Sequence, residues 1–379
     1  MKLTNDGYQQ AIRVLQHCAR PSGWFASGLP GGYAGLWARD SMTTSLGAAL
    51  IKNKFKPTFK ASLALLSKNQ SALGQIPNAV GDYNEDRKSR VTFNTIDSTL
   101  WYIIGQHIYA QAYHDGSLLK KYKKNIDRAF LWLAYQDPNE DKLLVQQPTM
   151  DWQDAFPHKY GRVINTQALH YGALRLAGKK SQAEHIKKVV NGNIEKYLSL
   201  YDKKRGYYLP WVWKNHDGDR EQETWFDTLG NLLAIITGLA TPKIAEKILD
   251  YIEQKKINRP YPCQAIYPPL RPADKEWQSY FSKAISKPYD YLNGGIWPFI
   301  GGFYVAALVK TKRHSRALSE LERLSHANKL GKDRVWEFNE WLGGRSGRPQ
   351  GAPYQAWSAG TYLFARQSVL DKKVPFFNY

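Results

Sequence analysis

Two adjacent segments, FNTIDSTLWYIIGQHIYAQAY (residues 93–113) and SLLKKYKKNIDRAFLWLAYQ (residues 117–136), carry the pattern that decides the fold. The first is apolar on nearly every side of a helix, whereas the second has an apolar stripe with Leu118, Ile126 and Leu133 opposite its lysines. A helix that is apolar all round must be buried on every side, and an amphipathic helix needs only one buried face. We therefore predict a hairpin of one inner and one outer helix.

The same alternation recurs along the whole chain. Helices are predicted at roughly 6–19, 40–53, 57–70, 94–114, 117–136, 161–178, 180–200, 223–238, 241–255, 293–310, 312–330 and 352–368. Six hairpins of this kind form two concentric rings, so we predict an all-α fold, an (α/α)6 toroid. An irregular helical bundle is an alternative, and an α-solenoid is disfavoured because no repeat of fixed period is present.

The length of 379 residues is compatible with one large domain or two ordinary ones. No linker composition marks a boundary, so we predict a single domain spanning residues 1–379. The long connections at 201–227 and 256–292 could instead form a small second domain, and parts of 207–227 could be short β-hairpins.

Composition and charge exclude several classes of function. The net charge of +20 comes from short basic groups spread over amphipathic helices, and no nucleic-acid motif accompanies them, so we expect solvated outer faces and no nucleic-acid partner. No stretch approaches the roughly 20 apolar residues that span a bilayer, and the N-terminus lacks an apolar signal core, which predicts a cytoplasmic protein with no membrane partner. Cys18, Cys263 and nine scattered histidines form no metal or redox spacing, so we expect no metal and no cofactor. The oligomeric state stays open.

The connections that precede the inner helices concentrate Gly, Trp and acidic residues, and in a toroid they meet at one end around a central funnel. One is PTMDWQDAFPHKYGR (148–162), with Asp151 and Asp154 among aromatics, and another is EFNEWLGGRSGR (337–348). Two carboxylates that flank a glycosidic bond are sufficient to hydrolyse it. Structural readings remain open for each acid: the aspartates could cap the next helix or pair with a basic neighbour, and the glutamates could form loop salt bridges.

Six segments resemble the six-hairpin glycoside hydrolases, nearest to the neutral/alkaline invertase family and more distantly to amylo-α-1,6-glucosidases of the glycogen-debranching type. They are WARDSMTTSLGAAL, TFNTIDSTLWYIIG, DAFPHKYGRVINTQALHYGALRLAG, FDTLGNLLAIITGLAT, YLNGGIWPF and GRPQGAPYQAWSAGTYLFA. They run in the order of the family from about residue 30 to residue 365. The resemblance implies a small carbohydrate as the binding partner and an (α/α)6 barrel that hydrolyses it.

The resemblance also implies roles for individual residues. Asp154 stands seven residues before Gly161 and thirteen before Gln167, as the general acid does in that family, and Glu340 stands seven before Gly347, as the general base does. The expected sugar-binding residues are Trp37, Arg39, Asp40, Asp97, Asp151, Trp152, Gln167, Asn293, Trp297, Arg348, Gln355 and Trp357.

Two departures from the family pattern bear on the substrate and the base. The invertases carry a Glu where this chain has Asn165, and the segment from Gly347 to Trp357 is shorter than theirs, which keeps Glu337 open as an alternative base. We predict an inverting exo-glycosidase acting on a small α-glucoside, with sucrose as the first candidate. The alternatives are an α-1,6-glucosidase, a hydrolase of trehalose or another disaccharide, and a sugar-binding toroid without catalysis.

Overall fold

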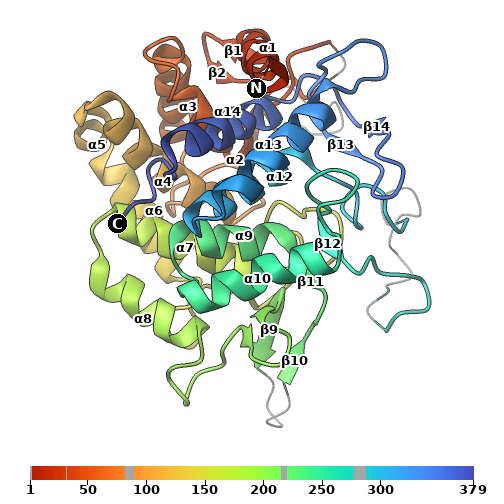
Figure 1. Ribbon diagram of the computed structural model, residues 1–379. Coiled ribbons are helices and arrows are strands. Elements are labelled where there is room, and N and C mark those ends of the chain that lie inside the picture. Colours follow the sequence, from red (N-terminus) through yellow and green to blue (C-terminus); the bar gives the residue numbers. More distant parts are fainter. Residues whose placement is uncertain (1, 31, 82–88, 215–219, 276, 278–286) are drawn as a thin grey trace.

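The computed structural model of the chain describes residues 2–30, 32–81, 89–214, 220–275, 277 and 287–379, and Figure 1 shows a mostly helical molecule. Six helices form the inner ring: α2 (Ala38–Ala48), α4 (Asp97–Tyr113), α7 (Ile164–Leu176), α9 (Thr228–Thr237), α12 (Pro298–Lys310) and α14 (Ala356–Asp371). Each contacts the next along the chain, and α14 contacts α2, which closes the ring. The prediction of an (α/α)6 toroid is confirmed.

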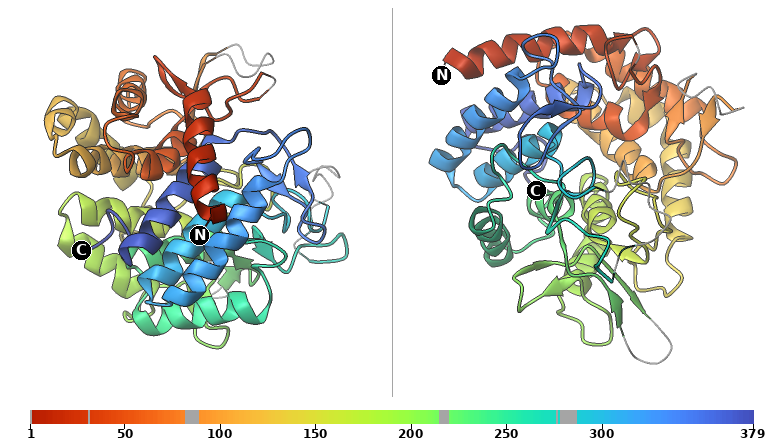
Figure 2. Two further views of the ribbon diagram at one scale, coloured as in Figure 1. Left: turned by 45° about the horizontal axis from the view of Figure 1, so that its top comes forward. Right: turned by 90° about the vertical axis from the view of Figure 1, so that its right-hand side faces the viewer.

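The outer ring is formed by the helices that alternate with these along the chain. They are α1 (Lys2–Cys18), α3 (Lys56–Lys68), α5 (Ser117–Lys121), α6 (Lys123–Ala134), α8 (Lys180–Val190), α10 (Pro242–Gln254) and α13 (His314–Lys329). In the right-hand view of Figure 2 the colours run around the ring in chain order, and loops occupy the centre. One apolar core with members from Ala11 to Phe377 fills the space between the elements. That the whole chain is one domain stays a prediction.

Burial follows the sequence pattern in both rings. In α12 every residue from Pro298 to Val309 is buried, as expected for an inner helix. In the outer helix α10, Ile244, Ile248 and Ile252 are buried at a spacing of four, and the Thr241 side chain caps the helix by accepting a hydrogen bond from the Ile244 backbone N–H. Helix type and buried face were therefore predictable from periodicity.

The largest departures from the predicted helices are in two segments. The segment 117–136 is split into α5 and α6 at Tyr122, whose backbone (φ −103°, ψ 21°) departs from the helical region. The segment 180–200 is helical only as far as Val190, because the following Asn191–Gly192 step ends it with Gly192 at a positive φ of 74°.

Short strands precede three inner helices and orient their N-terminal ends. They are β3 (Leu36–Trp37) before α2, β6 (Arg162–Val163) before α7 and β11 (Phe226–Asp227) before α9. The first pairs with β4 (Ala79–Val80), which pairs with β5 (Val91–Thr92). The second pairs with β9 (Trp211–Lys214), and the third with β12 (Ile266–Tyr267).

The remaining strands form small antiparallel pairs in the connections. They are β9 with β10 (Arg220–Gln222), β1 (Ala19–Arg20) with β2 (Gly23–Trp24), β7 (Tyr201–Asp202) with β8 (Tyr207–Tyr208), and β13 (Trp341–Leu342) with β14 (Pro349–Gln350). The hairpins expected within 207–227 are thus confirmed by β9 and β10. In Figure 1 the connections with β12, β13 and β14 lie together on the right-hand side of the molecule.

Candidate active site

A pocket of about 130 Å³ lies where the inner helices begin. Its lining residues are Ala26, Tyr33, Trp37, Arg39, Asp40, Trp152, Asp154, Tyr291, Trp297, Glu340, Gln355 and Trp357. They come from the starts of α2 and α14 and from the connections that lead into α2, α7, α12 and α14. The two carboxyl groups expected to do the chemistry, Asp154 and Glu340, therefore share one pocket.

Asp154 lies in an environment that favours a protonated carboxyl group. About 35% of its side chain is exposed, and the Nη1 atom of Arg39 lies 3.8 Å from its Oδ2 atom. Arg39 forms a buried ion pair with Asp97, whose Oδ2 atom lies 2.6 Å from the arginine Nε. Desolvation by the surrounding protein raises the pKa of Asp154 to about 6; Arg39 opposes this rise, and the charges of Asp97 and Asp151 add to it. Asp154 can thus keep its proton to a higher pH than an exposed aspartate does.

Glu340 is held in a fixed orientation. Its Oε1 atom accepts a hydrogen bond of 3.0 Å from the Tyr33 hydroxyl, and its Oε2 atom accepts one of 3.0 Å from the Ala352 backbone N–H. Burial raises the pKa of Glu340, and these two hydrogen bonds lower it because they stabilise the carboxylate. The arrangement suits an ionised group that accepts a proton.

Asp40 is the third carboxyl group in the pocket. It is 7% exposed, and desolvation raises its pKa to about 7; Arg39 opposes the rise and the charge of Asp154 adds to it. Since Asp40 and Asp154 interact, the two groups titrate as a coupled pair.

Glu337, the alternative base, does not line the pocket. Its side chain is 1% exposed and accepts hydrogen bonds from the backbone N–H groups of Lys332 at 2.8 Å and of Asp333 and Arg334 at 2.9 Å. This carboxylate closes a turn at the end of α13, which is a structural task.

Aromatic side chains form much of the pocket wall. Trp152 and Trp297 meet edge to face at 5.5 Å between ring centroids, and Trp297 meets Trp357 in the same way at 5.8 Å. Tyr33 and Tyr291 also line the pocket, and neither was predicted from the sequence. Both lie in connections that precede inner helices, but a tyrosine in a loop has no spacing signal that separates it from a core aromatic.

Four predicted sugar-binding side chains lie behind the pocket instead of lining it: Asp97, Asp151, Gln167 and Asn293 are all fully buried. Asp97 binds Arg39, and Asp151 binds Lys159. These two carboxylates neutralise buried cations and support the pocket wall, and their contact with sugar stays a prediction.

The buried side-chain amides of Gln167 and Asn293 form hydrogen bonds to the backbone of nearby connections. Gln167 accepts from the Leu144 N–H and donates to the Leu144 carbonyl, and Asn293 does the same with Leu270. Arg348 is exposed and is not among the lining residues, and its sugar contact stays a prediction.

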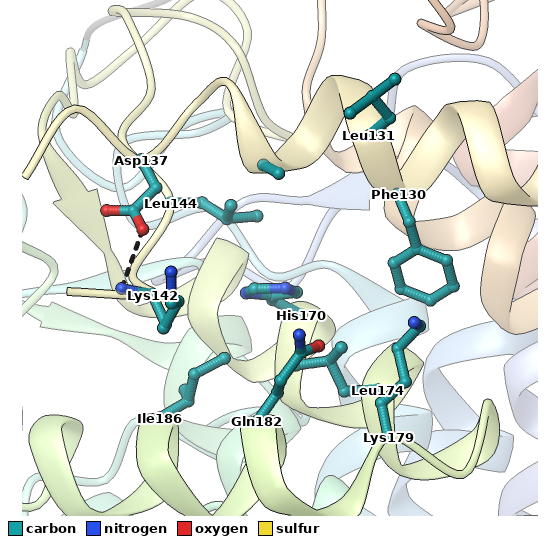
Figure 3. A pocket seen from close by; sticks show the side chains of 11 residues that line it. Phe130, Leu131, Asp137, Lys142, Leu144, His170, Leu174, Lys179, Gln182 and Ile186 are labelled. Carbon is teal, nitrogen blue, oxygen red and sulfur yellow. Dashed lines mark hydrogen bonds between the residues drawn. The ribbon is translucent and has the colours of Figure 1, made fainter. Parts of the chain in front are cut away.

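A larger cavity of about 270 Å³ lies elsewhere, between α6, α7 and α8 (Figure 3). Among the described residues its one lining carboxylate is Asp137, which accepts hydrogen bonds from the backbone N–H groups of Asp141 and Lys142. Burial lowers the pKa of His170, at the centre of Figure 3, to about 3, so this imidazole is neutral. Hydrolysis by two carboxyl groups needs a second acid, so the smaller pocket is the candidate active site.

Comparison with known families identifies the family of this chain. The family model described as Amylo-alpha-1,6-glucosidase matches residues 15–363. This chain belongs to that family of six-hairpin glycoside hydrolases.

The curated relatives of this glycoside hydrolase include plant invertases. Cytosolic invertase 1 of Oryza sativa subsp. japonica is 32% identical over 153 residues, and "Neutral/alkaline invertase 1, mitochondrial" of the same plant is 34% identical over 149 residues. These matches cover 39% and 38% of the chain and only 26% and 23% of the relatives' own lengths.

Solved structures share the fold at low sequence identity. The GH63 mannosylglycerate hydrolase from Thermus thermophilus in complex with glucose has a TM-score of 0.64 at 15% identity, with 94% of this chain and 98% of that chain covered. A rhamnosidase from Klebsiella oxytoca has a TM-score of 0.65 at 14% identity, with 97% and 64% covered.

Neither a membrane-spanning helix nor a metal-binding cluster is found in the described part of the chain. No helix there is both long and apolar enough to cross a membrane. The same residues include no group of three or more His, Cys, Asp or Glu side chains able to hold a metal ion.

Proposed function

We propose that this glycoside hydrolase is an inverting, exo-acting enzyme that cleaves a small neutral α-glucoside, with sucrose as the first candidate. The observation that carries the proposal is the presence of Asp154 and Glu340 in one pocket, in environments that suit opposite roles. Burial raises the pKa of Asp154 to about 6, which favours the protonated acid. Burial also raises the pKa of Glu340, but two hydrogen-bond donors stabilise its carboxylate and offset part of that rise.

In the proposed mechanism Asp154 protonates the glycosidic oxygen as the bond to the anomeric carbon breaks. Glu340 removes a proton from a water molecule that attacks the same carbon from the opposite face, which inverts its configuration. Glu340 is preferred to Glu337 because only Glu340 lines the pocket. Substrate binding displaces water and raises the pKa of Asp154 further, which keeps the acid protonated.

The lining of the pocket supports a neutral sugar as substrate. Among the described lining residues the one cation is Arg39, and Asp97, 2.6 Å away, already neutralises it. An anionic aglycone would therefore meet Asp40, Asp154 and Glu340 without a free positive charge. The small volume supports binding of a single terminal sugar ring, and Trp37, Trp152, Trp297 and Trp357 offer faces or edges for it.

Sucrose is supported by the invertase relatives, and an α-1,6-glucoside by the family to which the chain belongs. Trehalose and other disaccharides remain alternatives. Residues 215–219, 276 and 278–286, in the long connections 201–227 and 256–292, lie outside the described residues. A cytoplasmic location is part of the same proposal, supported by a relative named as a cytosolic invertase.

The test is hydrolysis of a panel of sucrose, trehalose, maltose, isomaltose and mannosyl substrates by the wild type, Asp154→Asn and Glu340→Gln. We expect turnover of one α-glucoside and a loss of at least about 10³-fold in each variant. Asp127→Asn and Glu195→Gln, at exposed positions, control for the same chemical changes and should keep full activity. Turnover that survives both active-site substitutions, or ligand binding with no turnover by the wild type, would overturn the proposal.

A further inference from the structure

Lys159 is a lysine that the mechanism above does not use, and it lies in the acid-bearing segment with 1% of its side chain exposed. Its Nζ atom lies 2.7 Å from Oδ2 of Asp151 and 3.2 Å from Oδ2 of Asp227. Both carboxylates are fully buried. Lysine is almost never fully buried unless it is paired, and here it neutralises one of the two buried negative charges and bridges both.

The three groups connect the acid-bearing segment to an inner helix. Asp227 is the N-cap of α9 and accepts a hydrogen bond of 3.0 Å from the Gly230 N–H. Asp151 accepts one of 2.9 Å from the Gln153 N–H. The ammonium group thus joins the beginning and the end of the segment 151–159 and fixes both to the start of α9.

Asp154 lies inside this clamped segment, between Asp151 and Lys159. Apart from Arg39, which lies 3.8 Å away, the described structure shows no ion pair to the Asp154 carboxylate. The position of the acid therefore depends on the path of its backbone, and a displacement of about 1 Å at a reacting group can cost on the order of 10²-fold in rate.

We propose that Lys159 is a positioning residue: through Asp151 and Asp227 it holds the segment that presents Asp154 to the glycosidic oxygen. The inference rests on the proposed function, since it requires Asp154 to be the general acid. It assigns to Lys159 no contact with the sugar and no proton transfer.

The test compares two substrates that differ in their need for an acid. Fluoride leaves α-glucosyl fluoride with little protonation, whereas the alcohol leaving group of an α-glucoside needs the proton of Asp154. For Lys159→Met we expect kcat on the α-glucoside to fall about 100-fold with KM changed less than threefold, and kcat on α-glucosyl fluoride to fall less than fivefold. The Tm should also fall by roughly 4–6 °C, because two buried carboxylates lose their cation.

A second variant and a matched control separate positioning from stability. Adding Asp151→Asn to Lys159→Met removes one uncompensated charge while Asn can still accept from the Gln153 N–H, so we expect a gain in Tm and about tenfold in kcat on the α-glucoside. Glu320→Gln breaks a different buried ion pair, with Arg259 at 3.0 Å, and should lower Tm without changing kcat on either substrate.

Equal losses on both substrates, or full activity of folded Lys159→Met on the α-glucoside, would overturn the positioning role. Asp154→Asn, measured beside these variants, tests the proposed function separately. If Asp154→Asn retained turnover of the α-glucoside, the assignment of the acid would fail whatever Lys159→Met showed.

Discussion

Replacing Tyr33 by Phe removes one of the two hydrogen bonds that hold Glu340. The Tyr33 hydroxyl donates to Oε1 of Glu340 at 3.0 Å, and the bond lowers the pKa of that carboxyl. A hydrogen bond to a charged group is worth about 1.5–3 kcal/mol. Because Tyr33 is only partly buried, water can replace part of the lost hydrogen bond in the variant. We therefore use the lower end of this energy range. About 1.4 kcal/mol corresponds to a tenfold change in the ionisation equilibrium.

The sign of the effect follows from the role of the base. Glu340 works as the carboxylate, so loss of a donor raises its pKa and moves the acidic limb of the pH profile to higher pH. We expect kcat/KM of Tyr33→Phe to be about tenfold below the wild type on the acidic limb and within about threefold of it on the plateau. The alkaline limb, which reports the acid, should not move.

The assay is kcat/KM measured across the pH range on the α-glucoside that the panel identifies, for the wild type, Tyr33→Phe and Tyr135→Phe. Tyr135 is 75% exposed and serves as the control for the same change. An unchanged acidic limb, or one displaced to lower pH, would refute the reasoning that Tyr33 stabilises the ionised base.

Three further predictions concern the acid, the alternative base and the fold. Asp154 must be protonated to act, and the pKa values of Asp154 and Asp40 are about 6 and about 7. The kcat/KM of the wild type should therefore fall as pH rises through this range. A flat profile up to pH 9 would contradict this prediction. Glu337→Gln should lower the free energy of unfolding, measured in urea, by about 1–3 kcal/mol and change kcat less than fivefold. A loss in kcat equal to that of Glu340→Gln would instead assign the role of base to Glu337. Thr241→Ala should cost about 1 kcal/mol in the same urea experiment with unchanged kcat, and no loss of stability would mean that the cap on α10 contributes nothing.

The ring architecture could be predicted from the sequence because hydrophobic periodicity reports burial directly. Segments such as 93–113 are apolar on all sides and must be buried on every side, as they are in the inner ring. The boundary at Val190 was missed, because periodicity gives weak information on where a helix ends.

The proposed acid and base, Asp154 and Glu340, were predicted from a family spacing, and both line one pocket. The surroundings of the pair were only partly predictable. Asp97 and Asp151, predicted as sugar-binding residues, form ion pairs with Arg39 and Lys159, and a sequence does not show which buried cation an acid will meet. Tyr33 was missed because its contact with Glu340 joins residues 307 positions apart.

The most direct test of the account is the anomeric configuration of the first product, followed by ¹H NMR from the start of hydrolysis of the active α-glucoside. In the proposed mechanism Asp154 is the acid, and Glu340 is the base that activates water on the opposite face of the sugar. This mechanism predicts that β-glucose appears first and that the α anomer forms only later, by mutarotation. Initial release of α-glucose would mean retention, and it would contradict the assignment of Glu340 as a base acting through water.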